Sequence, residues 1–261
     1  MKLYNGDCLE IMKNIPDKSI DMILCDLPYG VTDCKWDILI PFDLLWEQYN
    51  RVIKDNCAIV LFGSEPFATI LRYSNLKYYK YDWVWDKVTG KGHLNAKIKP
   101  LQQTEYICVF GKHKINYYPI MERREKDRPD VSAEYSMSET AKSNRKNIRE
   151  KIIRTHRYPK NILRYSNASN KNRLHPTQKP VDLLEYLIKT YTNEGEIVLD
   201  NCMGSGSTGV ACLNTNRKFI GIEKDENYFQ IAKERLEETK LKLEQSNKEI
   251  SEEQSQIEAF F

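Results

Sequence analysis

The 261-residue sequence contains no long apolar segment. None of its hydrophobic runs approaches the roughly 20 residues that a helix needs to cross a bilayer. The first ten residues carry one lysine together with Asp7 and Glu10, and they lack the apolar core of a signal peptide. These absences argue against membrane-spanning classes and predict a protein that stays in the cytoplasm.

Cysteine and histidine are too few and too scattered for a disulfide framework or a metal site. The seven cysteines are an odd number, and no two of them are spaced as C-x-x-C. The four histidines stand singly, whereas zinc sites combine closely spaced Cys and His ligands. We therefore expect reduced, buried thiols and no bound metal.

The net charge of +3 is small, but the charges are strongly segregated along the chain. Residues 111–175 hold 17 Lys and Arg against 7 Asp and Glu, so this segment carries +10 and the rest of the chain −7. A basic block on an otherwise acidic protein is typical of a polyanionic partner such as nucleic acid. A solvated surface segment is the alternative, since Lys- and Asn-rich stretches are often exposed.

Short apolar runs bounded by turn residues predict buried strands. They lie at 21–26, 58–63, 81–85, 105–110, 196–200 and 218–223. Stretches of helical period stand between several of them, for example at 42–54 and 180–192. Alternation of this kind predicts an α/β fold with a largely parallel sheet covered by helices on both faces.

The remaining segments are less regular. Residues 111–172 show few apolar runs, which indicates an insertion with its own local structure or mobile parts. Thr177 is placed to cap the helix that follows, and Pro180 suits the first turn of that helix. From Asp225 onward the Glu- and Lys-rich tail predicts a surface helix that frays after about Gln245.

A glycine-rich loop follows the predicted strand 196–200. It reads Asp200-Asn-Cys-Met-Gly204-Ser-Gly206-Ser-Thr208-Gly209, and the next predicted strand ends at Glu223. Glycines at a strand-to-helix turn let the backbone approach a ligand closely, and an acidic residue ending the next strand can bind ribose hydroxyls. The pattern indicates a nucleoside-containing cofactor. The loop also satisfies the dinucleotide fingerprint, and a simple packing turn is a third interpretation.

A second motif, Asp26-Leu27-Pro28-Tyr29-Gly30, stands at the carboxyl end of the predicted strand 21–26. Open α/β sheets bind their ligands at this end of the strands. By itself the motif is also consistent with a tight turn built on Pro28 and Gly30. A glycine-rich cofactor loop in the same chain makes the turn interpretation much weaker.

Together the two motifs resemble the amino methyltransferases of DNA, whose catalytic signature is Asp/Asn/Ser-Pro-Pro-Tyr/Phe. In the β group of that family the catalytic motif comes first, a target-recognition region follows and the cofactor loop comes last, which is the order here. Two further boxes of the family are present, Asn5-Gly6-Asp7-Cys8-Leu9 and His175-Pro-Thr-Gln-Lys-Pro180. The resemblance runs from about Tyr4 to Leu236 and departs at Leu27, where the family usually has proline. Leucine supplies the same backbone carbonyl.

The resemblance implies a Rossmann-like methyltransferase fold of prokaryotic or phage origin, with S-adenosylmethionine as cofactor and double-stranded DNA as partner. It implies a catalytic part at 1–110, an inserted basic target-recognition segment at 111–174, a cofactor-binding part of the same domain at 175–245 and a charged tail at 246–261. Because family members often pair, a homodimer is a further expectation.

The resemblance also assigns residues. The expected catalytic residues are Asp26, Leu27, Pro28 and Tyr29: the Asp26 carboxylate and Leu27 carbonyl would accept the amino hydrogens of a flipped-out base, on which Tyr29 would stack, for an in-line attack. Glu223 would bind the ribose, Asp7 the adenine edge, and Asp200 and Lys179 the methionine part. The full expected cofactor set is Asp7, Cys8, Thr177, Lys179, Asp200, Met203, Gly204, Gly206, Ser207, Thr208 and Glu223. The expected DNA contacts are Arg123, Arg124, Arg128, Arg145, Lys146, Arg149 and Arg154.

The first residue of the catalytic motif indicates the target. Asp or Asn is usual in family members that act on adenine, and Ser in those that act on N4 of cytosine, so Asp26 favours N6 of adenine. Methylation of cytosine N4 is the main alternative. Transfer to RNA or protein also stays open, as does a nicotinamide-dependent oxidoreductase if the glycine loop is taken alone.

Overall fold

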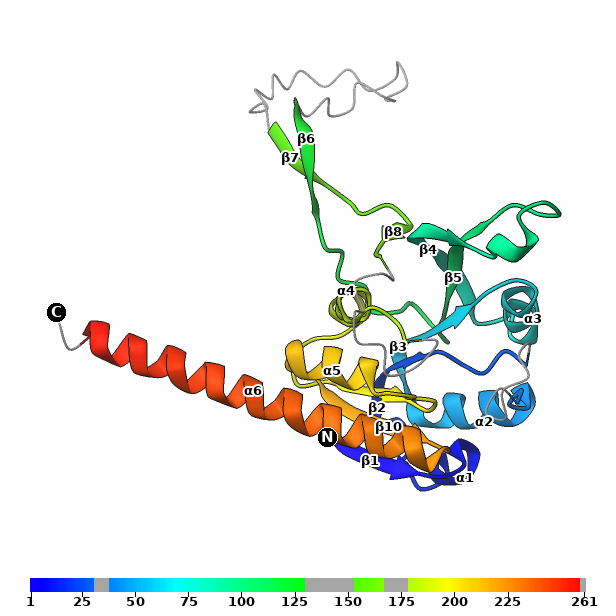
Figure 1. Cartoon of the computed structure of the whole chain (residues 1–261), viewed down its shortest axis with the longest axis horizontal. Helices are drawn as coiled ribbons and strands as arrows, with labels where there is room; N and C mark the ends of the chain where they lie inside the picture. The colour runs from blue at the N-terminus through cyan, green and yellow to red at the C-terminus, as the bar shows by residue number, and fades with distance from the viewer. Residues whose placement is uncertain (31–37, 130–152, 167–177, 259–261) are drawn as a thin grey trace, which may run out of the picture. The chain divides into compact units, whose positions relative to one another are not determined.

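The computed structural model describes residues 1–30, 38–129, 153–166 and 178–258, and within the chain it separates two compact units. The larger unit comprises Met1–Tyr118 with Asn161–Phe261, and the smaller unit is Pro119–Lys160. The larger unit contains, within the described residues, an eight-stranded sheet in the order β1-β10-β9-β2-β3-β5-β4-β8 (Figure 1).

The strands of this sheet are mostly parallel. Their bounds are β1 (Lys2–Asn5), β2 (Ile20–Cys25), β3 (Ile53–Gly63), β4 (Tyr79–Lys91), β5 (Gln102–Phe110), β8 (Ile162–Arg164), β9 (Ile197–Asp200) and β10 (Lys218–Glu223). β5 runs antiparallel to both of its neighbours, β3 and β4, so β4 again points the same way as β3. Every predicted strand is present, and the predicted fold class is confirmed.

Helices cover both faces of the sheet. They are α1 (Cys8–Met12), α2 (Phe42–Val52), α3 (Phe67–Ser74), α4 (Val181–Tyr191), α5 (Ser207–Asn214) and α6 (Glu226–Glu258), with a short 3-10 turn, η1, at His93–Asn95. Alternate side chains of β2 point to opposite faces. Met22 and Leu24 belong to the apolar cluster that includes residues of α4, α5 and α6, whereas Ile23 and Cys25 belong to the cluster with α1, α2 and α3.

Two predictions about helix ends were wrong. The helix expected from Pro180 begins at Val181, with Pro180 as its N-cap, and the expected cap Thr177 lies outside the described residues. The C-terminal helix does not end near Gln245 but continues to Glu258. Beyond its last core residue, Leu236, the helix is solvated, and charge pairs one turn apart such as Lys240–Glu244 and Glu238–Lys242 support it.

The smaller unit holds an antiparallel pair, β6 (Glu122–Pro129) with β7 (Ile153–Arg157). This unit, Pro119–Lys160, covers fewer residues than the expected basic segment 111–174. β8 follows it in the chain but is hydrogen-bonded to β4, in a register that pairs Leu163 with Trp85, and therefore belongs to the large sheet. A three-residue edge strand is too short for its periodicity to show in the sequence.

Candidate active site

The chemically reactive side chains gather where the parallel strands end. β2, β9 and β10 lead directly into Asp26, the glycine loop and Glu223 at their carboxyl ends. Because β5 is antiparallel, its first residues lie beside the end of β4, and the register pairs Glu105 with Trp85. The topology thus brings a further acidic residue, Glu105, to the edge that holds the two sequence motifs.

Both oxygens of Asp26 have partners in the structure. The Tyr29 hydroxyl donates to Oδ1 at 2.8 Å, and Nζ of Lys179 lies 2.5 Å from Oδ2. Burial raises the pKa of the Asp26 carboxyl, the ammonium of Lys179 opposes this rise, and the negative charge of Glu105 adds to it. Asp26 is therefore an acceptor whose protonation state is set by the charges around it.

A second carboxylate, Glu105, completes a buried chain of charges. Its Oε1 lies 3.2 Å from Nζ of Lys179, and its Oε2 lies 2.6 Å from Nζ of Lys87. The side chains of Lys87, Glu105 and Lys179 are only 10%, 6% and 9% exposed. Burial favours the neutral acid, but the two ammonium groups hold the pKa of Glu105 below its usual range. The order Lys87, Glu105, Lys179, Asp26 alternates in sign, which compensates the cost of burying each charge.

Tyr29 lies between the two carboxylates. Its hydroxyl is 2.8 Å from Asp26 Oδ1 and 3.0 Å from Glu105 Oε1, and a single proton can be donated to only one of them at a time. Its ring stacks on Phe67 with centroids 4.6 Å apart. The ring expected to stack on a base is thus held by an aromatic neighbour from α3.

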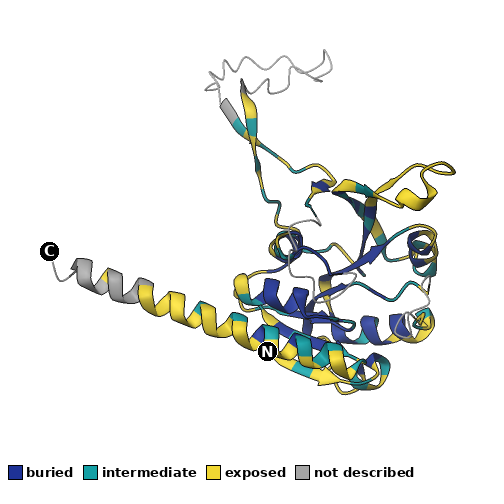
Figure 2. Cartoon of the chain, in the orientation of Figure 1, coloured by how far each residue is buried: buried dark blue, intermediate teal, exposed yellow. Residues whose placement is uncertain are grey.

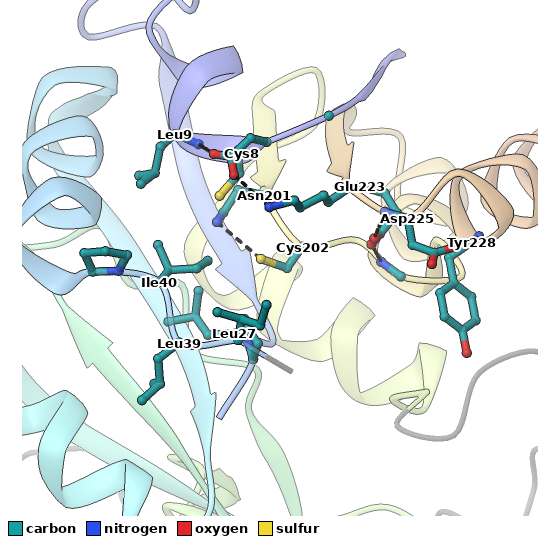
Figure 3. Close-up of a pocket in the computed structure, with 17 residues that line it drawn as sticks. Cys8, Leu9, Leu27, Leu39, Ile40, Asn201, Cys202, Glu223, Asp225 and Tyr228 are labelled. Carbon is teal, nitrogen blue, oxygen red and sulfur yellow. Dashed lines mark hydrogen bonds and ion pairs between the residues drawn. The ribbon is translucent and has the colours of Figure 1, made fainter. Parts of the chain in front are cut away.

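A cavity of about 430 Å³ adjoins this edge on the side of β10. Of the residues expected to bind cofactor or base, it is lined by Asp7, Cys8, Leu27, Pro28, Gly204 and Glu223. Figure 3 shows Glu223, Asp225 and Tyr228 on one side of it, and Leu9, Ile40 and Leu27 on the other. Asp26 is therefore followed directly in the chain by two residues that line the cavity, Leu27 and Pro28.

The polar side of the cavity is organised around Glu223. Its Oε2 accepts a hydrogen bond from the Gly204 amide at 2.9 Å, and its Oε1 accepts one from the Asp225 amide at 2.8 Å. Gly204 and Gly206 have φ of 52° and 79°, values that glycine adopts most easily, so the loop turns tightly beside this carboxylate. Burial raises the pKa of Glu223. A carboxylate beside apolar walls fits the ribose and adenine of a nucleoside cofactor.

Of the expected cofactor residues that the structure describes, the others do not line this cavity. Asp200 is buried and its Oδ1 accepts from the Cys202 amide, while Ser207 accepts from Arg235, and Met203 and Thr208 are also buried. Gly206 is the N-cap of α5 and packs closely on Ala232. These residues support the glycine loop without lining the cavity. Their roles as direct cofactor contacts remain predictions.

Lys179 has other partners than the expected methionine carboxylate. Its ammonium lies against Asp26 and Glu105 and 5.0 Å above the ring of Phe62. We therefore place Lys179 on the base side of the site, beside the catalytic motif. Thr177, from the same sequence box, lies outside the described residues.

The expected DNA-binding residues are described only in part. Arg123 donates to the Thr155 carbonyl at 3.2 Å and Arg124 to the His156 carbonyl at 3.0 Å, both across the β6–β7 pair. The backbones of Arg128 and Arg154 face each other in the same pair. Arg145, Lys146 and Arg149 lie outside the described residues.

Sequence reasoning missed Lys87 and Glu105 as site residues. Both stand at the ends of predicted strands, 81–85 and 105–110, where a charged residue next to a buried run is a usable signal. It also missed the cavity residues Leu9 and Asn201, which stand inside two of the quoted motifs, and Tyr228, which has no distinguishing sequence pattern.

Metal centres and membrane-spanning helices are both missing from the described ranges. There, no group of three or more His, Cys, Asp or Glu side chains is arranged to hold a metal ion. No helix in the same ranges is both long enough and apolar enough to cross a bilayer.

Comparison with known proteins identifies the family. A model of the DNA methylase family, covering N6 and N4 enzymes, matches residues 20–234. The chain is 31% identical over 252 residues to the type II methyltransferase M.HpaI of Haemophilus parainfluenzae, which covers 90% of this chain and 74% of that protein. It is 28% identical over 257 residues to the DNA adenine methyltransferase YhdJ of Escherichia coli strain K12, covering 90% and 82%.

A solved structure agrees with these relatives. The crystal structure of the M1.HpyAVI–SAM complex matches with a TM-score of 0.61 and 28% identity, and covers 90% of this chain and 98% of that chain. Its cofactor is the one for which the cavity beside Glu223 is suited. The chain therefore belongs to the N6/N4 DNA methylase family and is a DNA methyltransferase that uses S-adenosylmethionine.

Proposed function

We propose that the enzyme methylates N6 of adenine in double-stranded DNA, with Asp26 as the acceptor that activates the amino group. One observation carries the proposal. Asp26 stands at the end of β2, and the next two residues, Leu27 and Pro28, line the cavity that contains Glu223. A base amino group bound to Asp26 would then lie directly beside a cofactor held in that cavity, which is the arrangement that in-line transfer requires.

The chemistry needs acceptors because the amino nitrogen is a poor nucleophile whose lone pair is delocalised into the ring. S-adenosylmethionine supplies the electrophilic methyl group when it is bound. The ionised carboxylate of Asp26 would accept a hydrogen bond from the amino group and stabilise the positive charge that develops on the nitrogen. Lys179 can keep its bond to Oδ2, so the amino group would take Oδ1.

Tyr29 must give up Oδ1 for this to happen. Its hydroxyl already lies 3.0 Å from Glu105 Oε1, so a small rotation would transfer its hydrogen bond from Asp26 to Glu105. This exchange would leave the hydroxyl satisfied and open one oxygen of Asp26 to the base. The base reaches this pocket only after rotating out of the duplex.

Adenine is favoured over cytosine by Asp26 and by the similarity to YhdJ, which is named a DNA adenine methyltransferase. Both bases carry an amino group beside a ring nitrogen, so the carboxylate alone does not discriminate between them. The test is to methylate duplex DNA, digest it to nucleosides and separate these by mass spectrometry, with Asp26→Ala as the inactive control. N6-methyladenine is expected. N4-methylcytosine as the dominant product would overturn the choice of base. If duplex RNA treated in the same way were methylated while DNA was not, the proposal as a whole would be overturned.

A further inference from the structure

The connection between β4 and β5 is an exposed loop of unusual composition. Between Gly92 and Leu101 it contains two lysines, Lys97 and Lys99, and one histidine, and no acidic residue. It also presents two large apolar side chains to solvent, Leu94 at 101% exposure and Ile98 at 84%. Figure 2 shows this connection in the exposed colour.

The tip of the loop is ordered by its own backbone. The amide of Asn95 donates to the Gly92 carbonyl at 2.9 Å, and the amides of Ile98 and Lys99 donate to the Asn95 carbonyl at 2.9 and 3.0 Å. Gly92 has φ of 95°, which closes the turn. Leu94 lies in η1 and Ile98 in the turn that follows it. Both exposed apolar side chains therefore belong to one short protrusion at the tip of the loop.

The loop is connected directly to the base side of the active site. It follows the last part of β4, which carries Lys87; the ammonium of Lys87 holds Glu105, and Glu105 in turn holds Lys179 against Asp26. The Val88 amide donates to Asp86 Oδ1 at 2.8 Å, and Gln103 donates to the same oxygen at 2.7 Å, which ties the two ends of the loop together. The loop therefore projects from the edge at which a target base must enter.

Charge decides which partner fits this protrusion. A second copy of the chain docking through the same loop would bring its lysines together, which is unfavourable in a two-fold contact. Duplex DNA offers phosphates to the lysines and a base stack to the apolar side chains. Apolar wedges between base steps are a known means of unstacking a duplex.

We propose that the β4–β5 loop is a second DNA contact, in which Leu94 and Ile98 enter the stack beside the target base while Lys97 and Lys99 bind the adjacent phosphates. The inference rests on the proposed transfer to a base in duplex DNA, and it assigns the loop a role in base flipping separate from the chemistry at Asp26. By entering the stack, Leu94 and Ile98 would act as a wedge that lowers the free-energy cost of flipping the target base out of the duplex. Their contribution therefore depends on how firmly that base is paired.

The first experiment compares Leu94→Ala/Ile98→Ala with wild type in single-turnover methylation. The control is Leu76→Ala, which removes an exposed leucine at the other end of β4. On a fully paired duplex the double variant should be slower by about tenfold, and on a duplex whose target base is mispaired it should recover most of this loss, because less flipping work is needed. Equal rates on the paired duplex, or equal losses on both duplexes, would overturn the wedge.

The second experiment tests the lysines. Replacing Lys97 and Lys99 together by glutamine should make the plot of log affinity against log salt shallower by about 1.8, since each phosphate contact contributes about 0.9. The control replaces the exposed Lys77 and Lys80, near the start of β4. An unchanged slope for Lys97→Gln/Lys99→Gln would overturn the phosphate contact.

Two further outcomes separate the possible failures. If the Leu94→Ala/Ile98→Ala variant changed oligomeric state by light scattering while wild type was dimeric, the loop would be a contact between copies and the inference would be wrong. If wild type transferred no methyl group to either duplex, the proposed function itself would fail.

Discussion

At the scale of single residues, the main feature is that Asp26 shares its buried environment with one cation and one anion. Lys179 contacts its Oδ2, and Glu105 lies on the far side of the same ammonium. The two neighbours act on the Asp26 carboxyl in opposite directions, since Lys179 lowers its pKa and Glu105 raises it. The pH at which the enzyme loses activity should therefore depend on both.

We expect Lys179→Met and Glu105→Gln to shift the acidic limb of the methylation rate in opposite directions. Transfer needs ionised Asp26, so the rate falls as pH falls through the pKa of its carboxyl. Without Lys179 that pKa rises and the limb moves to higher pH. Without the charge of Glu105 the pKa falls and the limb moves to lower pH. Single-turnover rates across the acid range measure both effects.

The control for this prediction is Lys54→Met, which removes the cation of another ion pair, Lys54–Asp21, with a buried carboxylate at 2.5 Å. That variant should leave the limb in place even if it lowers stability. Shifts of the same sign for Lys179→Met and Glu105→Gln would contradict the charge chain as we describe it.

At the scale of elements, the β6–β7 pair carries basic side chains that are bonded from one strand to the other. Arg123 and Arg124 each donate to a carbonyl of β7, and Arg157 pairs with Glu122 at 2.8 Å across the two strands. These bonds hold long side chains in defined directions, which reduces the entropy lost when they bind phosphate. The β6–β7 pair is thus suited to contact a DNA backbone.

We predict that replacing Arg123, Arg124 and Arg128 together by glutamine weakens DNA binding and makes its salt dependence shallower, by about 0.9 for each phosphate that the variant no longer neutralises. A matched control replaces Lys233, Lys240 and Lys242, three exposed lysines of α6. Fluorescence anisotropy over a range of salt gives both slopes. A slope unchanged in the arginine variant would mean that the basic hairpin does not bind phosphates.

At the scale of the whole molecule, base and cofactor sides come from different parts of the chain. Asp26 directly follows β2 and Glu105 stands on β5, whereas the cavity is lined mainly by residues 6–9, residues 38–41, the glycine loop and residues 223–225. Leu27 and Pro28 are the short link between them. Mutations on the two sides should therefore have separable effects.

We expect cofactor to stabilise wild type and Asp26→Asn alike, by about 2.7 kcal/mol at one hundred times the dissociation constant. Glu223→Gln should show a much smaller stabilisation because it loses a charged acceptor of the cavity. Asp26→Asn should instead lose transfer by roughly 100-fold or more. Thermal unfolding with and without S-adenosylmethionine, together with a transfer assay, makes the comparison. Loss of cofactor stabilisation in Asp26→Asn with its retention in Glu223→Gln would reverse the assignment of the two sides.

Much of this architecture can be predicted from the sequence by itself. Strands such as β2 are buried along their whole length and read as continuous apolar runs, and the two motifs stand directly after two of these strands. The glycine loop and Glu223 share one cavity, as local spacing indicates. These features depend on residues close together in the chain, so pattern and spacing are enough to find them.

Only the tertiary structure decided which charges meet at Asp26. Lys179 is 153 positions away in the chain, and Glu105 reaches the site because β5 runs antiparallel between β3 and β4. The sequence pattern reports which face of a strand is buried, but it does not report which strands become neighbours or in which direction they run. The acceptor could be predicted from its motif, whereas the lysine and the second carboxylate that set its charge could be found only once the sheet was assembled.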